Sequence, residues 1–175
     1  MKATILPSLR MRDAGYFLIV FSFIVALPHV ASAQIDPRTL GTWKLNIAKS
    51  KFDPGPPLRS MTVTREQVGD AVKYTIEQED ATGIHRTIVE APKYDGKDYP
   101  RKVQDYPRAG PPVPDTISLR RIDADTVEET LKKSGKVVQT ASQVLSKDGK
   151  VITTTLTGTT VSGQPVHVVL VYDKQ

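Results

Sequence analysis

The sequence predicts an all-β protein, an up-and-down antiparallel β-barrel of about 8–10 strands, preceded by a signal peptide. Three observations point to this fold. Short runs rich in Val, Ile and Thr follow one another along the chain, and Asp- and Gly-containing turns separate most of them roughly every dozen residues. After Gln34, no long segment has the 3.6-residue apolar period of an amphipathic helix. Consecutive strands at this spacing typically pair as antiparallel neighbours.

Composition limits the functions open to the chain. It has 175 residues, of which 39% are hydrophobic and 25% are charged, and this suits one globular domain. There is no cysteine, which excludes a disulfide scaffold, a thiolate metal site, a cysteine nucleophile and a lipidated N-terminal cysteine. The glycines stand singly at turns and form no phosphate-binding motif, so no cofactor is expected.

Residues 1–33 have the features of a secretory signal peptide. Three basic residues precede the apolar run Tyr16–Leu27, and Ala31–Ala33 supplies the small residues of a cleavage site. The apolar run has about a dozen residues, whereas a membrane span needs about 20. Cleavage before Gln34 would leave a single β-barrel domain, residues 34–175, in a secreted or periplasmic protein without a membrane span.

The charge of this predicted mature chain argues against nucleic acid as a partner. Residues 1–33 hold three of the 24 basic and one of the 19 acidic residues, so 21 and 18 remain and the net charge is +3. The basic surplus is spread along the chain and forms no stripe with interleaved aromatic residues.

Turn residues and β-branched runs together place the strands. Asp and Gly tolerate the backbone angles of tight hairpins, and branched side chains favour strands. The expected strands are Thr42–Ala48, Arg59–Val68, Ala71–Glu79, Ile84–Ala91, Thr116–Ile122, Thr126–Lys133, Lys136–Leu145, Lys150–Thr157 and Val166–Tyr172.

Alternation of apolar and polar residues indicates one buried face. Trp43, Leu45 and Ile47 share a face of the first strand, and Trp43 is expected to plug the base of the barrel. A flat meander this wide would expose its edges, and pairing of the last strand with the first removes them. A two-sheet sandwich is the alternative architecture.

Two proline-rich segments interrupt the strands. Lys49–Leu58 has three prolines and is not expected to be helical. Pro92–Asp115 has six prolines, with a small hairpin expected over Tyr94–Tyr99 and extended chain over Pro107–Pro114. Connections this long are often functional. The segment either caps a barrel end or binds a protein partner through the side chains favoured at interfaces, which are Tyr99, Arg101, Tyr106 and Arg108.

Both ends of the chain resemble calycin barrels, the group of lipocalins and intracellular fatty-acid-binding proteins. Gly41-Thr42-Trp43 matches the Gly-x-Trp of their first strand, and Lys51-Phe52-Asp53 follows it. Asp148–Thr153 and Val171–Lys174 look like the final hairpin of the fatty-acid-binding group. The chain is most similar to uncharacterised secreted lipocalin-like proteins of bacteria, which implies a barrel that holds a small apolar or amphipathic molecule.

Two departures from the fatty-acid-binding pattern bear on the ligand. The last strand of that group carries Arg-x-Tyr, which holds the ligand carboxylate, whereas Leu170-Val171-Tyr172 keeps the Tyr and lacks the Arg. The proline-rich Lys49–Leu58 stands where that group has two short lid helices. A carboxylate is costly in an apolar lumen without a cation. The pattern therefore favours a neutral apolar ligand, or none, over a fatty acid.

Four residues are candidate ligand contacts. Tyr74 lies on the inner face of its strand, and Tyr172 stands where the resemblance implies a hydroxyl contact to ligand. Glu129 lies on the same strand face as Val127 and Leu131, and Arg121 lies on the same face as Ile117 and Leu119. Both side chains would then point inward and could form an ion pair across neighbouring strands. Packing at the barrel ends is the alternative for the tyrosines, and solvated strand positions are the alternative for Glu129.

Nothing in the sequence indicates catalysis or a metal. No nucleophile motif occurs, and His85 and His167 lie on different strands without the spacing of a metal site. No catalytic residue is assigned, and an enzyme would have to rely on a lumenal His85, Glu129 or Arg121. The remaining alternative to a ligand-binding barrel is a filled barrel that acts as an envelope protein-interaction module.

Overall fold

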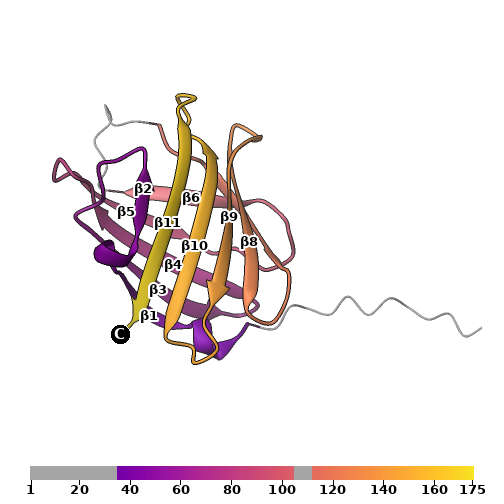
Figure 1. The fold of residues 1–175 in the computed structure, drawn as a ribbon. Helices are drawn as coiled ribbons and strands as arrows, with labels where there is room; N and C mark the ends of the chain where they lie inside the picture. The colour runs from indigo at the N-terminus through magenta and orange to yellow at the C-terminus, as the bar shows by residue number, and fades with distance from the viewer. Residues whose placement is uncertain (1–34, 105–111) are drawn as a thin grey trace, which may run out of the picture. The chain divides into compact units, whose positions relative to one another are not determined.

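The computed structural model describes residues 35–104 and 112–175. These residues form the predicted all-β barrel (Figure 1), and the expected signal peptide lies outside them. Two 3₁₀ turns, η1 (Pro37–Thr39) and η2 (Ile47–Lys49), flank the first strand. The strands are β1 (Gly41–Leu45), β2 (Lys51–Asp53), β3 (Ser60–Val68), β4 (Ala71–Glu79), β5 (His85–Glu90), β6 (Tyr99–Gln104), β7 (Thr116–Arg121), β8 (Thr126–Lys133), β9 (Lys136–Leu145), β10 (Val151–Thr159) and β11 (Pro165–Lys174).

The strand order confirms a closed barrel and excludes a sandwich. From β3 to β11 each strand pairs antiparallel with the next along the chain. β1 pairs with β3 on one side and with β11 on the other, which places Trp43 opposite Lys174 and Leu45 opposite Tyr172. The ring therefore has ten strands, and the short β2 adds to it beside β11. This is the closed up-and-down antiparallel barrel that the sequence predicts.

The seam beside β11 departs from the prediction that the first strand reaches Ala48. The Asn46 side chain accepts a hydrogen bond from the Lys49 N–H and caps η2, so β1 ends at Leu45. Ile47 consequently leaves the inner face and is 38% exposed. After the turn, β2 pairs with the N-terminal half of β11, with Phe52 opposite Val168. The strand β11 thus has two partners on one side, β1 at its C-terminal end and β2 in its N-terminal half.

The strand β6 replaces the small hairpin expected over Tyr94–Tyr99. Asp95 bridges to Arg120 of β7, while Tyr99 begins a strand that pairs with β5 and, for two residues, with β7. Tyr99, Arg101 and Val103 are the less exposed residues of β6. Most of the extended run expected over Pro107–Pro114 lies outside the described residues.

One end of the barrel is densely packed. Trp43 is fully buried, and its indole N–H donates to the Thr39 carbonyl at 2.9 Å, which confirms the predicted plug. Arg38 Nη2 bonds Asp36 at 2.7 Å and Asp125 at 2.9 Å, and so ties η1 to the turn between β7 and β8. A void of only about 10 Å³ remains among the side chains at this end.

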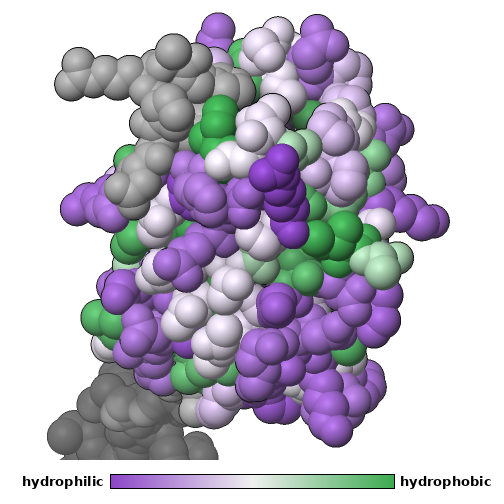
Figure 2. Space-filling model, turned by 90° about the vertical axis from the view of Figure 1, so that its left-hand side faces the viewer, coloured by the Kyte–Doolittle hydropathy of each residue, from purple (hydrophilic) through white to green (hydrophobic). Residues whose placement is uncertain are grey.

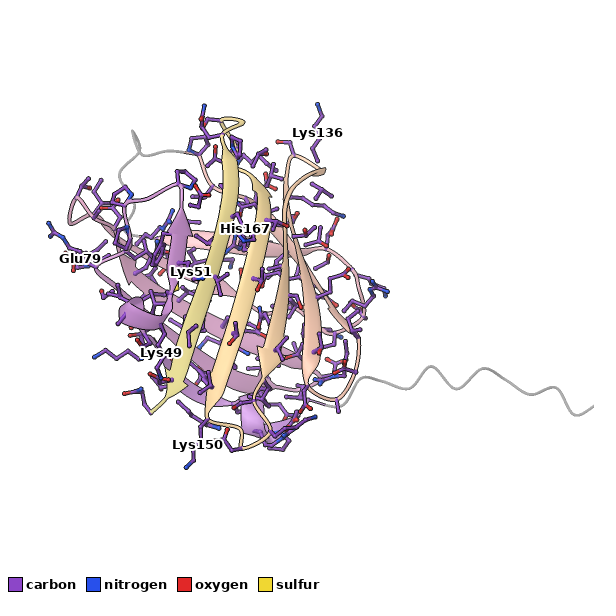
Figure 3. All side chains as sticks on the ribbon, viewed as in Figure 1. Lys49, Lys51, Glu79, Lys136, Lys150 and His167 are labelled. Carbon is purple, nitrogen blue, oxygen red and sulfur yellow. The ribbon has the colours of Figure 1, made fainter. Side chains whose placement is uncertain are left out.

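The outer surface is mainly polar. Figure 2 shows hydrophilic side chains over most of one face, with apolar ones in smaller patches. Lys49, Lys136 and Lys150 project away from the barrel (Figure 3). Within the described residues, none of the helical segments is long and apolar enough to cross a membrane.

Candidate ligand-binding lumen

Between the Trp43 plug and the opposite end, the barrel encloses a cavity of about 130 Å³. Every strand from β3 to β11 contributes at least one side chain to its wall. Period-two alternation directs these residues inward while their neighbours face solvent. The apolar part of the wall consists of Met61, Val63, Ile76, Ile88, Ile117, Leu131, Leu156 and Leu170.

Three polar side chains form a hydrogen-bonded chain across the lumen. Arg65 Nη2 donates to Gln143 Oε1 at 3.1 Å, and Gln143 Nε2 donates to Glu129 Oε2 at 2.6 Å. Gln143 therefore separates the guanidinium from the carboxylate and bonds both. Residues from β3, β9 and β8 meet in this chain only because the barrel is closed.

The Arg65 guanidinium is held between two aromatic rings. Its Cζ lies 5.1 Å from the centre of the Tyr74 ring and 5.8 Å from that of Trp43. Cations over aromatic faces are stabilised electrostatically, the more so when desolvated. Arg65 is only 6% exposed, and its Nε has no hydrogen-bond partner within the described part of the chain.

A second pair of charges is bonded directly. Arg101 Nε donates to Glu90 Oε2 at 2.5 Å, and the two side chains are 9% and 2% exposed. They lie on adjacent strands, β6 and β5, at the same register position. A charge-assisted bond of this kind satisfies a carboxylate that burial would otherwise penalise.

Burial also sets the protonation tendencies of the lumen. Desolvation raises the pKa of Glu129, and the nearby Glu90 carboxylate raises it further against the opposing effects of Arg101, Gln143 and Arg65. Desolvation likewise raises the pKa of Tyr74 and Tyr172, so both phenols stay protonated. The Tyr74 and Tyr94 hydroxyls lie 3.3 Å apart, and the Tyr172 hydroxyl donates to Met61 Sδ at 3.0 Å.

Three of the four predicted contact residues line this cavity. Tyr74, Glu129 and Tyr172 belong to its wall, but Arg121 does not. The predicted pair between Arg121 and Glu129 is wrong, because Glu129 lies opposite Leu119 and bonds Gln143.

Arg121 lies nearer the closed end of the barrel. In the register it is opposite Val127, and its guanidinium lies over the Tyr94 ring at 4.6 Å. Its Nε and Nη2 have no hydrogen-bond partner in the described structure, yet they face no cavity of comparable size. The face of β7 on which Arg121 lies was predicted correctly, but its position along the barrel axis was not.

Sequence reasoning missed six polar residues of the lumen, which are Arg65, Gln78, Glu90, Arg101, Gln143 and Thr154. Arg65 follows Met61 and Val63 at alternate positions, and Glu90 follows Ile88 in the same way, so parity was an available signal for both. Gln143 lies between Ala141 and Leu145 at alternate positions, so the same signal was available for it. Arg101 is a contact to a protein partner only in one of the two alternatives for Pro92–Asp115, and in the structure it points inward and pairs with Glu90.

The other residues considered for a site do not enter the lumen. The His85 side chain is 72% exposed and lies 3.8 Å from Glu79, and His167 is exposed on β11 (Figure 3). In residues 35–104 and 112–175, no group of three or more His, Asp or Glu side chains is arranged to hold a metal ion. Tyr99 donates to Asp95 at 3.0 Å, while Tyr106 and Arg108 lie outside the described residues.

Among the solved structures similar to this chain is a crystal structure of zebrafish ileal bile acid-binding protein in complex with cholic acid. It is 14% identical in sequence, with a TM-score of 0.45, and the match covers 79% of this chain and 99% of that chain. No family model matches the chain, and no curated protein matches it. The barrel architecture therefore rests on the strand order and the closure of β1 against β11.

Proposed function

We propose that the protein is a secreted or periplasmic lipocalin-like protein that binds a small amphipathic molecule in its lumen. The observation that carries this proposal is the cavity of about 130 Å³, which has mostly apolar walls and a few convergent polar groups. Ligand sites in proteins typically combine apolar walls with a small number of placed polar contacts. Export is supported by the basic start, apolar run and small-residue site within residues 1–33.

The size of the cavity limits the ligand. An apolar protein cavity of about 150 Å³ accommodates benzene, so 130 Å³ suits a compact molecule of similar bulk. Typical pockets for larger organic ligands are roughly 300–1,000 Å³. A long-chain lipid would require the walls to move apart, and a compact ligand would not.

Mass measurement of the purified protein tests both parts of the proposal. The full chain is expressed in a bacterial host with a C-terminal tag and purified without detergent. The denatured mass is expected to show loss of residues 1–33. The native mass is expected to exceed the denatured mass by the mass of one small molecule, because a buried site retains its ligand through purification.

Two matched variants identify the lumen as the site of retention. Leu156→Trp places a large side chain in the cavity wall, whereas Val144→Trp places one at an exposed position on β9. The excess mass should disappear only in Leu156→Trp. Equal native and denatured masses in the unaltered protein, with no change of Tm across a panel of small hydrophobic compounds, would overturn lumenal binding.

A further inference from the structure

We infer that the lumenal ligand is a compact anion bound by Arg65, and that its binding is accompanied by protonation of Glu129. This inference rests on the proposed lumenal binding and specifies its chemistry. It also departs from the neutral ligand favoured by the missing Arg of the last strand. In the folded barrel, β3 supplies a cation that β11 lacks.

The first argument is the unmet hydrogen-bonding capacity of Arg65. Its Nη2 is bonded to Gln143, but its buried Nε is left without a partner among the described residues. An unpaired buried donor costs about 1–3 kcal/mol, and more when it is charged. Arg65 also lines the cavity wall. Its Nε is buried behind that wall, so a turn of the side chain would bring this donor to an acceptor in the cavity and relieve the cost.

The second argument is that the carboxylates of the cavity wall, Glu90 and Glu129, already accept hydrogen bonds. Glu90 accepts from Arg101 and Glu129 accepts from Gln143. A cationic ligand would have to compete with these bonds. An anionic ligand would meet the donor that lacks a partner, and guanidinium groups bind carboxylates and similar anions through paired N–H bonds.

The proton requirement follows from the groups that face Glu129. They are Arg65 on β3, Tyr74 on β4, Glu90 on β5, Arg101 on β6, Gln143 on β9 and Tyr172 on β11. Glu90 is the like charge in this set, and an anion on Arg65 would add a second one. The burial that raises the pKa of Glu129 in the free protein therefore acts together with the ligand, so that binding draws a proton onto this carboxyl.

The sign of the pH dependence follows directly. A bound anion raises the pKa of Glu129 above its value in the free barrel, so the complex binds more protons than the free protein between those two pKa values. Affinity for an anion then increases as pH falls through this interval and levels off below it. Replacing Glu129 by Gln removes the titrating group and the dependence with it.

Calorimetry with benzenesulfonate and benzamide as probes tests whether the lumen prefers an anion to a neutral molecule of similar size. Both have the bulk of a substituted benzene, and the sulfonate stays ionised across the accessible pH range, whereas the amide is neutral. We expect benzenesulfonate to bind more tightly than benzamide, with an affinity that increases as pH falls toward the pKa of Glu129 in the free barrel. Titration in two buffers of different ionisation enthalpy should show proton uptake, and Glu129→Gln should abolish that uptake.

The variants Arg65→Met and Arg120→Met form the matched pair for this experiment. Loss of the lumenal guanidinium should weaken benzenesulfonate binding by at least about tenfold, the equivalent of one charge-assisted hydrogen bond, and change benzamide binding much less. Arg120 lies on the outer face of β7, where its side chain is 63% exposed, so its loss should alter neither probe. If Arg65→Met does not fold, Arg65→Lys should still weaken sulfonate binding, because an ammonium lacks the planar fork.

The outcomes distinguish this inference from the proposed function. Equal affinity for the two probes without proton uptake would overturn the inference and leave lumenal binding intact. Unchanged sulfonate binding in folded Arg65→Met or Arg65→Lys would overturn the role of Arg65. Failure of both probes to bind would also overturn the inference, while the native mass decides separately whether the lumen retains any ligand.

Discussion

The two ends of the barrel interior are built by the same strands and differ in character. Around Trp43 the packing leaves a void of about 10 Å³, whereas farther along the axis a cavity of about 130 Å³ holds two arginines and two glutamates. On β8, Val127 belongs to the packed end and Glu129, two residues later, to the lumen. The comparison indicates that side-chain packing fills one end, whereas the other leaves space beside charged groups suited to binding.

The largest effect is expected at the packed end. Trp43→Ala should destabilise the protein by about 4 kcal/mol, because it removes a fully buried side chain and opens a cavity. Urea unfolding followed by far-UV circular dichroism measures this loss, with Trp43→Phe as the smaller, ring-preserving change. A loss below about 1 kcal/mol would contradict the conclusion that this end is densely packed around Trp43.

A somewhat smaller loss is expected when the buried ion pair is broken. Arg101→Met should cost about 3 kcal/mol at neutral pH, because it leaves the Glu90 carboxylate buried without its cation. Combining it with Glu90→Gln should recover much of the loss. If the double variant were as unstable as the single one, the loss would be due to packing and not to the unpaired charge.

Glu129→Gln is expected to act in the opposite direction. Burial raises the pKa of Glu129 in the folded state, so this carboxyl favours folding below its unfolded pKa and opposes it as pH rises toward the folded pKa. The variant should therefore be more stable than the unaltered protein at neutral pH, and the difference should shrink as pH falls toward about 4.3. Unfolding free energies measured across this pH range test the prediction, and a constant difference would contradict it.

The smallest effect is expected outside the barrel. Arg120 donates to both carboxylate oxygens of Glu128 at 3.1 Å, yet the two side chains are 63% and 44% exposed. Arg120→Met should change stability by no more than about 0.5 kcal/mol, and added salt should reduce the change further. Denaturant midpoints at low and high salt measure this. A loss as large as that of Arg101→Met would remove the contrast between inner and outer ion pairs.

Side-chain alternation was sufficient to predict the fold and part of the site. It directed Tyr74 and Glu129 inward, and both line the cavity. It could not give height along the barrel axis, which depends on the stagger between strands. Arg121 is the example, since it faces inward but lies beside Tyr94, away from Glu129.

The strand β6 could not be recognised from local sequence. Tyr99–Gln104 contains a proline and few β-branched residues, and its pairing with β7 covers only two residues. Its place in the barrel is fixed by β5, with Arg101 opposite Glu90. This long-range pairing has no local signal, so the inward direction of Arg101 could not be predicted from the sequence around it.

The pairing of β1 with β11 joins residues at opposite ends of the described chain, with Trp43 opposite Lys174. Such a contact closes a very long loop and is typical of slowly folding topologies. The seam cannot form until β11 is free to pair with β1. Until then the unpaired edges of β1 and the growing sheet remain open to association with other chains, so the time before ring closure is the period of greatest aggregation risk.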